Sequence, residues 1–189
     1  MLRRPRQNSE RPIRLRPLTP GDLATALRWV NDAAIMRTVN RVLPVTGHEQ
    51  RQWYRDYVTR RDRVIFAIET VGRRPRYIGN GALNPIDWRS RKAELMIYIG
   101  HPRSRDRGYG TAAVAALLEF AFDQMNLHRV YLYTLGGNRR AQRAFAKCGF
   151  RLEGRQRDDV FLDGRYHDSV RMAILDRAFR RRPPLTRRP

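Results

Sequence analysis

The sequence predicts a single α/β domain in which a mixed sheet is flanked by helices. The chain has 189 residues, of which 41% are hydrophobic, and this suits one compact domain with a core. Short strand-like apolar runs alternate with segments that have helical spacing. Near the end, Asp163-Gly164 separates two strand-like runs, which is the pattern of a β-hairpin.

The first third of the chain predicts one strand and two helices. Residues 13–16 alternate apolar and basic side chains, as a strand with one buried face does. A turn of Thr, Pro, Gly and Asp then leads into a helix over 23–30, where apolar residues recur at helical spacing. A second helix is expected over 46–60, because Thr46 and Glu49 form a capping box at its start.

The remaining elements follow in order. Three strands are expected over 64–68, 77–83 and 93–99, and the loop 101–107 then enters a helix. The apolar residues of that helix share one face: Val114, Leu117, Leu118, Ala121 and Met125. The last elements expected are a strand over 130–134, a helix over 139–147, a strand over 150–154, and a hairpin of 160–162 with 166–174.

Several classes of protein are excluded by composition. No window approaches about 18 consecutive apolar residues, so a membrane span is not expected. The basic start of the chain is not followed by the apolar segment of a secretory signal. Cys148 is the single cysteine, so no internal disulfide forms, and the histidines have no metal-ligand spacing. We therefore expect a cytoplasmic protein without a metal.

The net charge of +21 is concentrated at the two ends of the chain. Residues 1–16 and 177–189 together carry eleven of these charges. Basic tails of this kind either bind RNA, for example on the ribosome, or are simply solvated. The organisation expected is a basic tail over 1–11, a domain over 12–176, and an Arg/Pro-rich tail over 177–189.

The loop over residues 105–111 is the most informative segment, because it follows an apolar strand and opens an amphipathic helix. Gly108 and Gly110 allow the backbone to approach a ligand closely, and Arg105 and Arg107 add positive charge. Together with the free N–H groups of a helix start, these residues would hold a pyrophosphate. The Gly-x-Gly pattern alone also fits an ordinary turn.

Two motifs in this order resemble the GNAT superfamily of acetyl-CoA-dependent N-acetyltransferases. Arg105, Gly108 and Gly110 match the family's Arg/Gln-x-x-Gly-x-Gly/Ala motif, and the segment 138–150 is similar to its second signature, Asn-x-x-Ala-x-x-x-Tyr-x-x-x-Gly-Phe. The resemblance covers about residues 12–176. It is strongest for the branch with ribosomal-protein N-terminal (alanine/serine) and spermidine/spermine N-acetyltransferases.

The resemblance implies a mostly antiparallel sheet in which the strands 94–99 and 130–134 splay apart around the pantetheine of acetyl-CoA. Backbone groups near Ile97, Tyr98 and Ile99 would bind the pantetheine and polarise the thioester. The pyrophosphate would be held by Arg105, Asp106, Arg107, Gly108, Tyr109, Gly110 and Thr111. Asn138, Ala141 and Phe145 would line the pantetheine.

The resemblance also implies direct attack of a primary amine on the thioester. A carboxylate can take the proton of the amine, and Glu94 is the candidate, as a general base or as a contact of the acceptor. Many relatives have a tyrosine as proton donor where this chain has Phe145. Either the thiolate leaves without help, or another hydroxyl such as Tyr98, Tyr133 or Ser169 substitutes, or activity is lost.

The acceptor amine stays open at this stage. A protein N-terminus and a small amine, such as a polyamine or an amino sugar, fit about equally well, although a +21 chain repels a polycation. Trp53, Tyr54 and Trp88 are candidates to shape the acceptor site. A homodimer is compatible with the final hairpin. The alternative function is a non-catalytic module that binds acetyl-CoA or RNA.

Overall fold

The computed structural model describes residues 11–39 and 42–181. A seven-stranded sheet has the order β1-β2-β3-β4-β5-β7-β6, and only β4 and β5 run parallel. Its strands are β1 (Ile13–Pro17), β2 (Val64–Thr70), β3 (Tyr77–Asp87), β4 (Lys92–Ile99), β5 (Arg129–Leu135), β6 (Arg151–Leu162) and β7 (Arg165–Leu175). The helices are α1 (Leu23–Val30), α2 (Ala33–Thr38), α3 (Gly47–Thr59), α4 (Tyr109–Glu119), α5 (Arg139–Cys148) and α6 (Asp176–Arg180). The expected mixed, mostly antiparallel sheet with flanking helices is confirmed.

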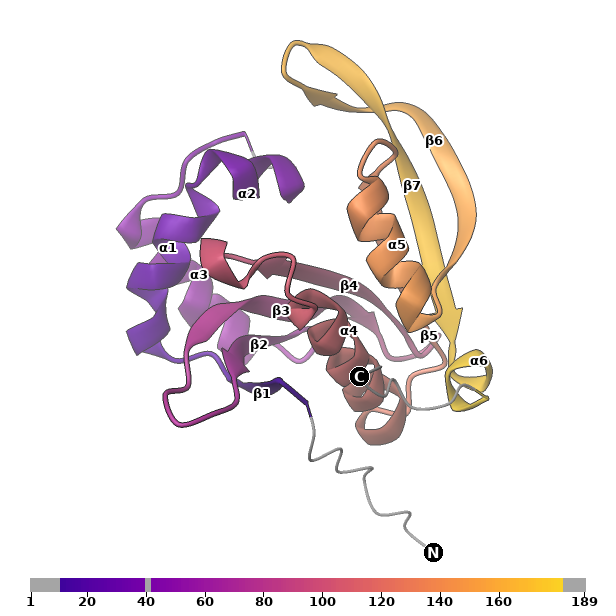
Figure 1. Ribbon diagram of the computed structural model, residues 1–189, viewed down its shortest axis with the longest axis horizontal. Coiled ribbons are helices and arrows are strands. Elements are labelled where there is room, and N and C mark those ends of the chain that lie inside the picture. The colour runs from indigo at the N-terminus through magenta and orange to yellow at the C-terminus, as the bar shows by residue number, and fades with distance from the viewer. Residues whose placement is uncertain (1–10, 40–41, 182–189) are drawn as a thin grey trace, which may run out of the picture.

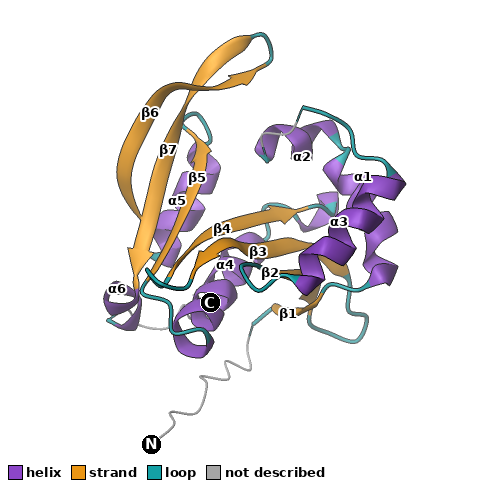
Figure 2. Cartoon of the chain, turned by 180° about the vertical axis from the view of Figure 1, so that it is seen from behind, coloured by secondary structure: helices purple, strands orange, loops and turns teal. Residues whose placement is uncertain are grey.

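Helices cover both faces of the sheet (Figures 1 and 2). Helix α4 lies on one face, and α1 and α3 lie on the other. The larger core lies between α4 and the sheet, and its fully buried members include Leu83, Ala93, Leu117, Leu118, Phe122, Val130 and Leu132. On the opposite face, Leu18, Leu23 and Ala67 form a smaller cluster with Trp53 and Tyr54 of α3.

Strand β4 contributes to both faces. Ala93 and Leu95 belong to the core under α4. Because successive side chains of a strand point to opposite faces, Glu94, Met96 and Tyr98 share the face that α1 and α3 cover. Both faces of β4 contribute to the site described below, because Ile97 and Ile99 continue the face of Ala93 and Leu95.

The parallel pair β4 and β5 is joined over a short stretch. Lys92, Ala93 and Glu94 pair with Arg129, Val130 and Tyr131, and no further pair follows. Strand β4 nevertheless continues to Ile99, where it pairs with β3, and β5 continues to Leu135, where it pairs with β7. The two strands thus diverge, which confirms the expected splayed pair.

The final hairpin differs from the expectation in one respect. In place of separate strands over 150–154 and 160–162, the chain forms one strand, β6, of 12 residues. Its register with β7 shifts twice, between Leu152 and Gly154 and between Gln156 and Val160. Bulges of this kind absorb extra residues without ending a strand, so β6 continues past residues 157–159, which have no pair in β7.

The Asp163-Gly164 turn of this hairpin is confirmed. Asp163 has φ of 52° and Gly164 has φ of 78°, the left-handed values that a two-residue turn of this class requires at both positions. Asp163, at the tip of the hairpin, forms an ion pair with Arg37 of α2, in which Arg37 Nη2 lies 3.1 Å from Asp163 Oδ1.

Three further features were not expected. Helix α2 starts after Asp32, whose carboxylate accepts hydrogen bonds from Ala34 and Ile35 N–H groups. The α-helix expected to reach Met125 ends at Glu119 instead, and the chain then forms a π-helical turn, Phe120–Gln124. The domain boundary expected at residue 176 precedes helix α6, whose Phe179 ring lies 5.2 Å from that of Phe122.

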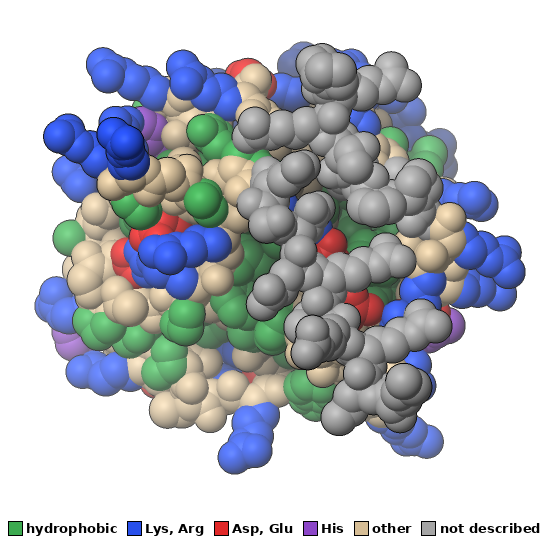
Figure 3. All heavy atoms as spheres, turned by 60° about the horizontal axis from the view of Figure 1, so that its bottom comes forward, with side chains coloured by type: hydrophobic (Ala, Val, Ile, Leu, Met, Phe, Trp, Pro, Cys, Tyr) green, Lys and Arg blue, Asp and Glu red, His purple; other side chains and the backbone are tan. Residues whose placement is uncertain are grey.

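Positive charge is spread over the surface. On the face shown in Figure 3, Lys and Arg side chains occur all around the rim, whereas Asp and Glu are few. The basic segments 1–10 and 182–189 lie outside the described residues. A surface of this charge repels cations at long range and attracts anions, at low ionic strength most strongly.

Candidate functional site

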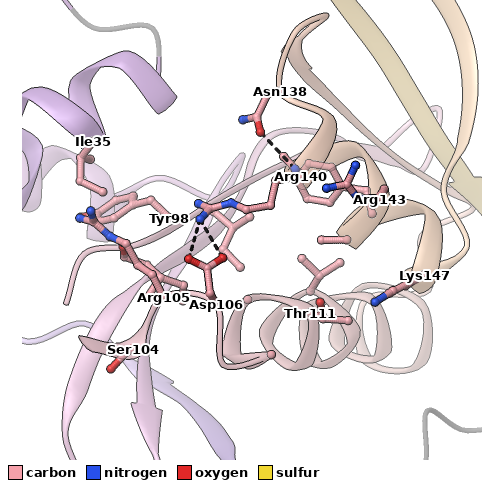
Figure 4. Close-up of a pocket in the computed structure, with 18 of the residues that line it drawn as sticks. Ile35, Tyr98, Ser104, Arg105, Asp106, Thr111, Asn138, Arg140, Arg143 and Lys147 are labelled. Atoms are coloured by element: carbon pink, nitrogen blue, oxygen red, sulfur yellow. Dashed lines mark hydrogen bonds and ion pairs between the residues drawn. The ribbon is translucent and has the colours of Figure 1, made fainter. Parts of the chain in front are cut away.

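A cavity of about 460 Å³ lies between the diverging end of β4, the start of α4 and helix α5 (Figure 4). It brings together most of the residues expected to hold the cofactor: Ile97, Tyr98, Ile99, Arg105, Asp106, Gly108, Gly110, Thr111, Asn138, Ala141 and Phe145. Two expected residues are not part of its lining. Arg107 is exposed, and Tyr109 packs against the core beside Ile78.

The loop before α4 presents an anion-binding end to this cavity. Gly108 caps the helix with φ of 78°, a left-handed conformation that glycine adopts without strain. The N–H groups of the first helical turn, at Tyr109, Gly110 and Thr111, have no partner within the helix. These N–H groups and the positive end of the helix dipole favour a phosphate here.

Arg105 fixes this loop against the end of β4. Its Nε donates to the carbonyl of Ile99 at 3.1 Å, and its Nη2 donates to the carbonyl of Gly100 at 3.1 Å. The guanidinium remains 26% exposed and lies 3.9 Å from Asp32. Its charge is therefore held at the cavity wall by backbone carbonyls, which do not neutralise it.

Three basic residues of α5 also line the cavity and were not singled out from the sequence. Arg140, Arg143 and Lys147 follow one another at spacings of three and four, which places them on one face of the helix. Arg140 forms an ion pair of 2.8 Å with Asp106, so loop and helix meet across the cavity (Figure 4). The helical spacing downstream of Asn138 was the signal that could have identified them.

Apolar side chains make up much of the remaining lining of the cavity. They are Ile35 of α2, Val114 of α4, Ala144 and Phe145 of α5, and the expected Ile97 and Ile99 of β4. The Phe145 ring meets the Phe150 ring edge-on, with 5.8 Å between the ring centroids, and carries no hydroxyl. A cavity lined by both cationic and apolar side chains suits a ligand that has phosphates and an uncharged arm.

A second cavity, of about 590 Å³, lies against the opposite face of the sheet under α3. It shares Ile97 and Tyr98 with the first cavity, so the two meet at β4. Of the aromatic residues expected near an acceptor, Trp53 lines this cavity. Tyr54 instead donates to the carbonyl of Leu18 at 3.1 Å, and Trp88 donates to the carbonyl of Arg61 at 2.9 Å.

Tyr98 stands where the cavities meet and belongs to a chain of polar groups. The Tyr77 hydroxyl donates to Asn80 Oδ1 at 2.7 Å, and Asn80 Nδ2 donates to the Tyr98 hydroxyl at 2.8 Å. Burial raises the pKa of Tyr98 to about 12, although the hydrogen bond from Asn80 acts in the opposite direction. Tyr98 therefore keeps its proton at neutral pH, and its oxygen is already an acceptor.

Glu94 lies on the same sheet face as Tyr98 but lines neither cavity. Three residues lie between the two, and the four steps of about 3.3 Å correspond to about 13 Å along β4. Burial raises the pKa of Glu94 above its ordinary value, and the charge of Arg171 offsets part of that rise. Tyr133 and Ser169, also considered as proton donors, line neither cavity, and Ser169 donates to Gln156 at 3.0 Å.

Residues 11–39 and 42–181 contain no cluster of three or more His, Cys, Asp or Glu side chains able to hold a metal ion. Within the same residues, no helix combines the length and the apolar character that crossing a membrane requires. Cys148 is buried.

Comparison with known proteins adds a family and several relatives. The family model "Acetyltransferase (GNAT) domain" matches residues 13–151. The chain is 29% identical over 163 residues to the spermidine N(1)-acetyltransferase of Vibrio cholerae, covering 86% of this chain and 92% of the relative. A crystal structure of the V. cholerae enzyme with CoA and spermine has a TM-score of 0.83, 28% identity, and covers 89% of this chain and 98% of that chain. A dodecameric structure of the V. cholerae enzyme has a TM-score of 0.75 and 28% identity, and covers 87% of this chain and 94% of that chain.

Proposed function

This chain belongs to the acetyltransferase (GNAT) family and is an acetyl-CoA-dependent N-acetyltransferase, and we propose that its acceptor is a small primary amine that meets the thioester beside Tyr98. One observation carries the proposal. The two cavities lie on opposite sides of β4 and share Ile97 and Tyr98, so a donor in one and an amine in the other can come into contact there. Direct transfer needs this arrangement and no covalent enzyme intermediate.

The residues of the first cavity fit the parts of acetyl-CoA. The helix start at Gly108 and the cations Arg105, Arg140 and Arg143 would hold its phosphates, and the apolar side chains of the lining would surround the pantetheine arm. Beyond Glu94, the edge of β4 that faces β5 has no strand partner among the described residues. Its backbone groups are therefore available to the amides of the pantetheine, as they would be to another strand.

We propose Tyr98 as the proton donor to the departing thiolate. When the amine nitrogen bonds to the carbonyl carbon and the C–S bond breaks, the sulfur takes the Tyr98 hydroxyl proton, and solvent restores it. Asn80 orients that hydroxyl by donating to its oxygen, which leaves the hydrogen directed elsewhere. A backbone N–H of β4 would stabilise the negative charge on the carbonyl oxygen. Phe145 has no proton to supply.

We propose an indirect role for Glu94. At about 13 Å along the strand from Tyr98, its carboxylate can accept the proton of the amine only through intervening water. The raised pKa of Glu94 makes proton uptake easier than for an exposed carboxylate. Its position at the last residue pair of β4 with β5 also supports a structural role, because it faces Arg171 and Tyr131.

The spermidine N-acetyltransferases among the relatives make polyamines the first acceptors to test, and a protein N-terminus is the second. The dodecameric relative supports the proposal that this chain also assembles with copies of itself. A cytoplasmic location remains our proposal, and the lone Cys148 is compatible with a reducing compartment. Contact with RNA rests on the charge of the segments 1–10 and 182–189 alone.

The test is release of free thiol from acetyl-CoA by the purified full chain with a panel of primary amines. Gly108→Trp places a large side chain at the loop before α4. An added Cβ atom there would meet nothing within 4 Å, although the φ of 78° strains any residue other than glycine. We expect thiol release with one class of amine and its loss in Gly108→Trp. Binding of acetyl-CoA without release for any amine or peptide would contradict the proposal and favour a non-catalytic binding module.

A further inference from the structure

The second cavity is lined mostly by apolar side chains, and its polar side chains carry no charge. Its volume of about 590 Å³ falls within the range of small-molecule sites. Among its described lining residues there is no Asp, Glu, Lys, Arg or His, and the polar side chains are three amides and two tyrosines. The apolar majority consists of Val30, Val39, Val42, Leu43, Trp53, Ile65, Ala82, Met96 and Ile97.

Part of this apolar lining is left in contact with water. Val42 is 72% exposed, Leu43 is 74% exposed, and Met96 is 44% exposed. Large apolar side chains that stay exposed around a concave site indicate that a ligand covers them. The cavity also shares Ile97 and Tyr98 with the first cavity, so a ligand that covers these side chains would have its reacting group beside the residues nearest the thioester.

The absence of carboxylates from the described lining bears on the charge of this ligand. A polyamine carries further ammonium groups besides the one that reacts, and each loses its hydration when it enters a cavity. A desolvated ammonium is tolerated only when a carboxylate or several acceptors pair with it. Gln50, Asn80 and Asn84 are the amides available, and Asn80 is already committed to Tyr77 and Tyr98.

The same apolar environment favours the reacting amine in its neutral form. A free alkylamine has a pKa of about 10.4, and transfer into a site of low polarity lowers that pKa because the charged form is disfavoured. The nucleophile must be neutral to attack. An apolar cavity therefore promotes loss of the proton without a carboxylate beside the amine, which matches the position of Glu94 outside the lining.

We propose that the acceptor is a small primary amine carried on an apolar or aromatic skeleton, with a single positive charge in solution, and that the second cavity selects it by contact with Trp53, Ile65 and Met96. This inference rests on the proposed function. It distinguishes this chain from a polyamine acetyltransferase by the part of the acceptor that does not react. That part is apolar in the proposed acceptor, whereas in a polyamine it carries further ammonium groups.

The experiment measures kcat/KM for thiol release with the full chain at saturating acetyl-CoA. The probes are 2-phenylethylamine and hexylamine, compared with spermidine and with a tripeptide that begins with leucine. We expect the two apolar amines to exceed spermidine and the tripeptide by at least about tenfold, since burial of their uncharged skeletons in the apolar lining is favourable.

A charge introduced into the exposed part of the second cavity's lining tests whether this cavity selects the acceptor. Val42→Glu places a carboxylate in the lining at a position already 72% exposed, so folding is preserved. We expect the ratio of phenylethylamine to spermidine activity to fall about tenfold. Val71→Glu is the matched control, because Val71 is 58% exposed in a loop outside the cavity. It changes the net charge equally and should leave that ratio unchanged.

The outcomes separate this inference from the proposed function. Preference for spermidine in the unmodified chain, or an equal change of the ratio in both variants, overturns the inference while the acetyltransferase stands. Preference for the tripeptide overturns the small-molecule acceptor in favour of a protein N-terminus. Release with none of the probes or of the wider amine panel overturns the proposed function and the inference together.

Discussion

Replacing Tyr98 by phenylalanine removes one oxygen atom at the point where the two cavities meet. The ring stays, so the shape of both cavities is preserved. The lost hydroxyl accepts from Asn80 at 2.8 Å, and a buried hydrogen bond of this kind contributes about 1 kcal/mol to the free energy of unfolding. If the hydroxyl protonates the thiolate, kcat falls by about 100-fold, the lower end for a general acid and equivalent to about 2.7 kcal/mol.

Thiol release is measured at saturating acetyl-CoA, and affinity for CoA is measured by calorimetry. We expect the affinity to change less than about twofold, because a phenyl ring still fills the shared wall. Because burial raises the pKa of Tyr98 to about 12, the unmodified chain should show no loss of activity from its deprotonation below about pH 10.

Tyr77→Phe is the control for this substitution. It removes the hydroxyl that donates to Asn80 Oδ1 at 2.7 Å, yet Tyr77 lines neither cavity. It should cost about the same stability and change kcat less than about threefold. The assignment of Tyr98 as proton donor is refuted if its variant keeps its kcat, or if both variants lose kcat equally.

Three other substitutions test the charges described above. Arg140→Ala removes a cation and leaves Asp106 uncompensated at the cavity, so the dissociation constant for CoA should rise about tenfold; an unchanged constant in calorimetry would remove Arg140 from the site. Glu94→Gln should lower kcat less than about tenfold, because Glu94 lines neither cavity, and a loss above about 100-fold in the thiol assay would instead make it a direct base. Burial would raise the pKa of Asp22, but hydrogen bonds from Arg16 and Thr19 outweigh burial and hold this pKa below its ordinary value of 3.8. The ionised carboxylate therefore stabilises the fold above pH 3.8, and this stabilisation is lost as the pH falls below that value. Asp22→Asn should therefore destabilise the fold by about 2–3 kcal/mol at neutral pH, and in denaturant titrations the difference should shrink as the pH falls below 3.8; a difference that does not depend on pH would contradict this assignment.

Local signals in the sequence were sufficient for most elements of the fold. The capping box of Thr46 and Glu49 marks the start of α3, and Thr46 Oγ1 accepts from the Glu49 N–H at 3.2 Å as expected. The Asp163-Gly164 turn was readable because few residue pairs tolerate two consecutive left-handed conformations. These features depend on residues close together in the chain.

Features that depend on distant partners were missed. The polar run 156–159 does not alternate like a strand, and it stays in β6 because β7 lies beside it. Helix α2 has only six residues, too few for a helical period to be recognised. Its one local signal is the capping carboxylate of Asp32.

The two cavities also differ in how far the sequence predicts them. The lining of the donor cavity comes largely from two contiguous segments, 97–114 and 138–147, and motifs within them were recognisable. The second cavity collects Trp53, Ile65, Ala82 and Met96 from four separate elements. No spacing in the sequence records that these side chains meet, so the apolar character of the second cavity could not be predicted.

The short pairing of β4 with β5 divides the sheet into two plates that meet along a narrow seam of three residue pairs. One plate comprises β1 to β4 and the other comprises β5 to β7. The donor cavity is built from both, since Ile97 and Ile99 belong to the first plate, whereas Asn138 and Phe145 belong to the segment that connects β5 to β6 in the second. A molecule bound there would contact both plates and would add to the three residue pairs that connect them.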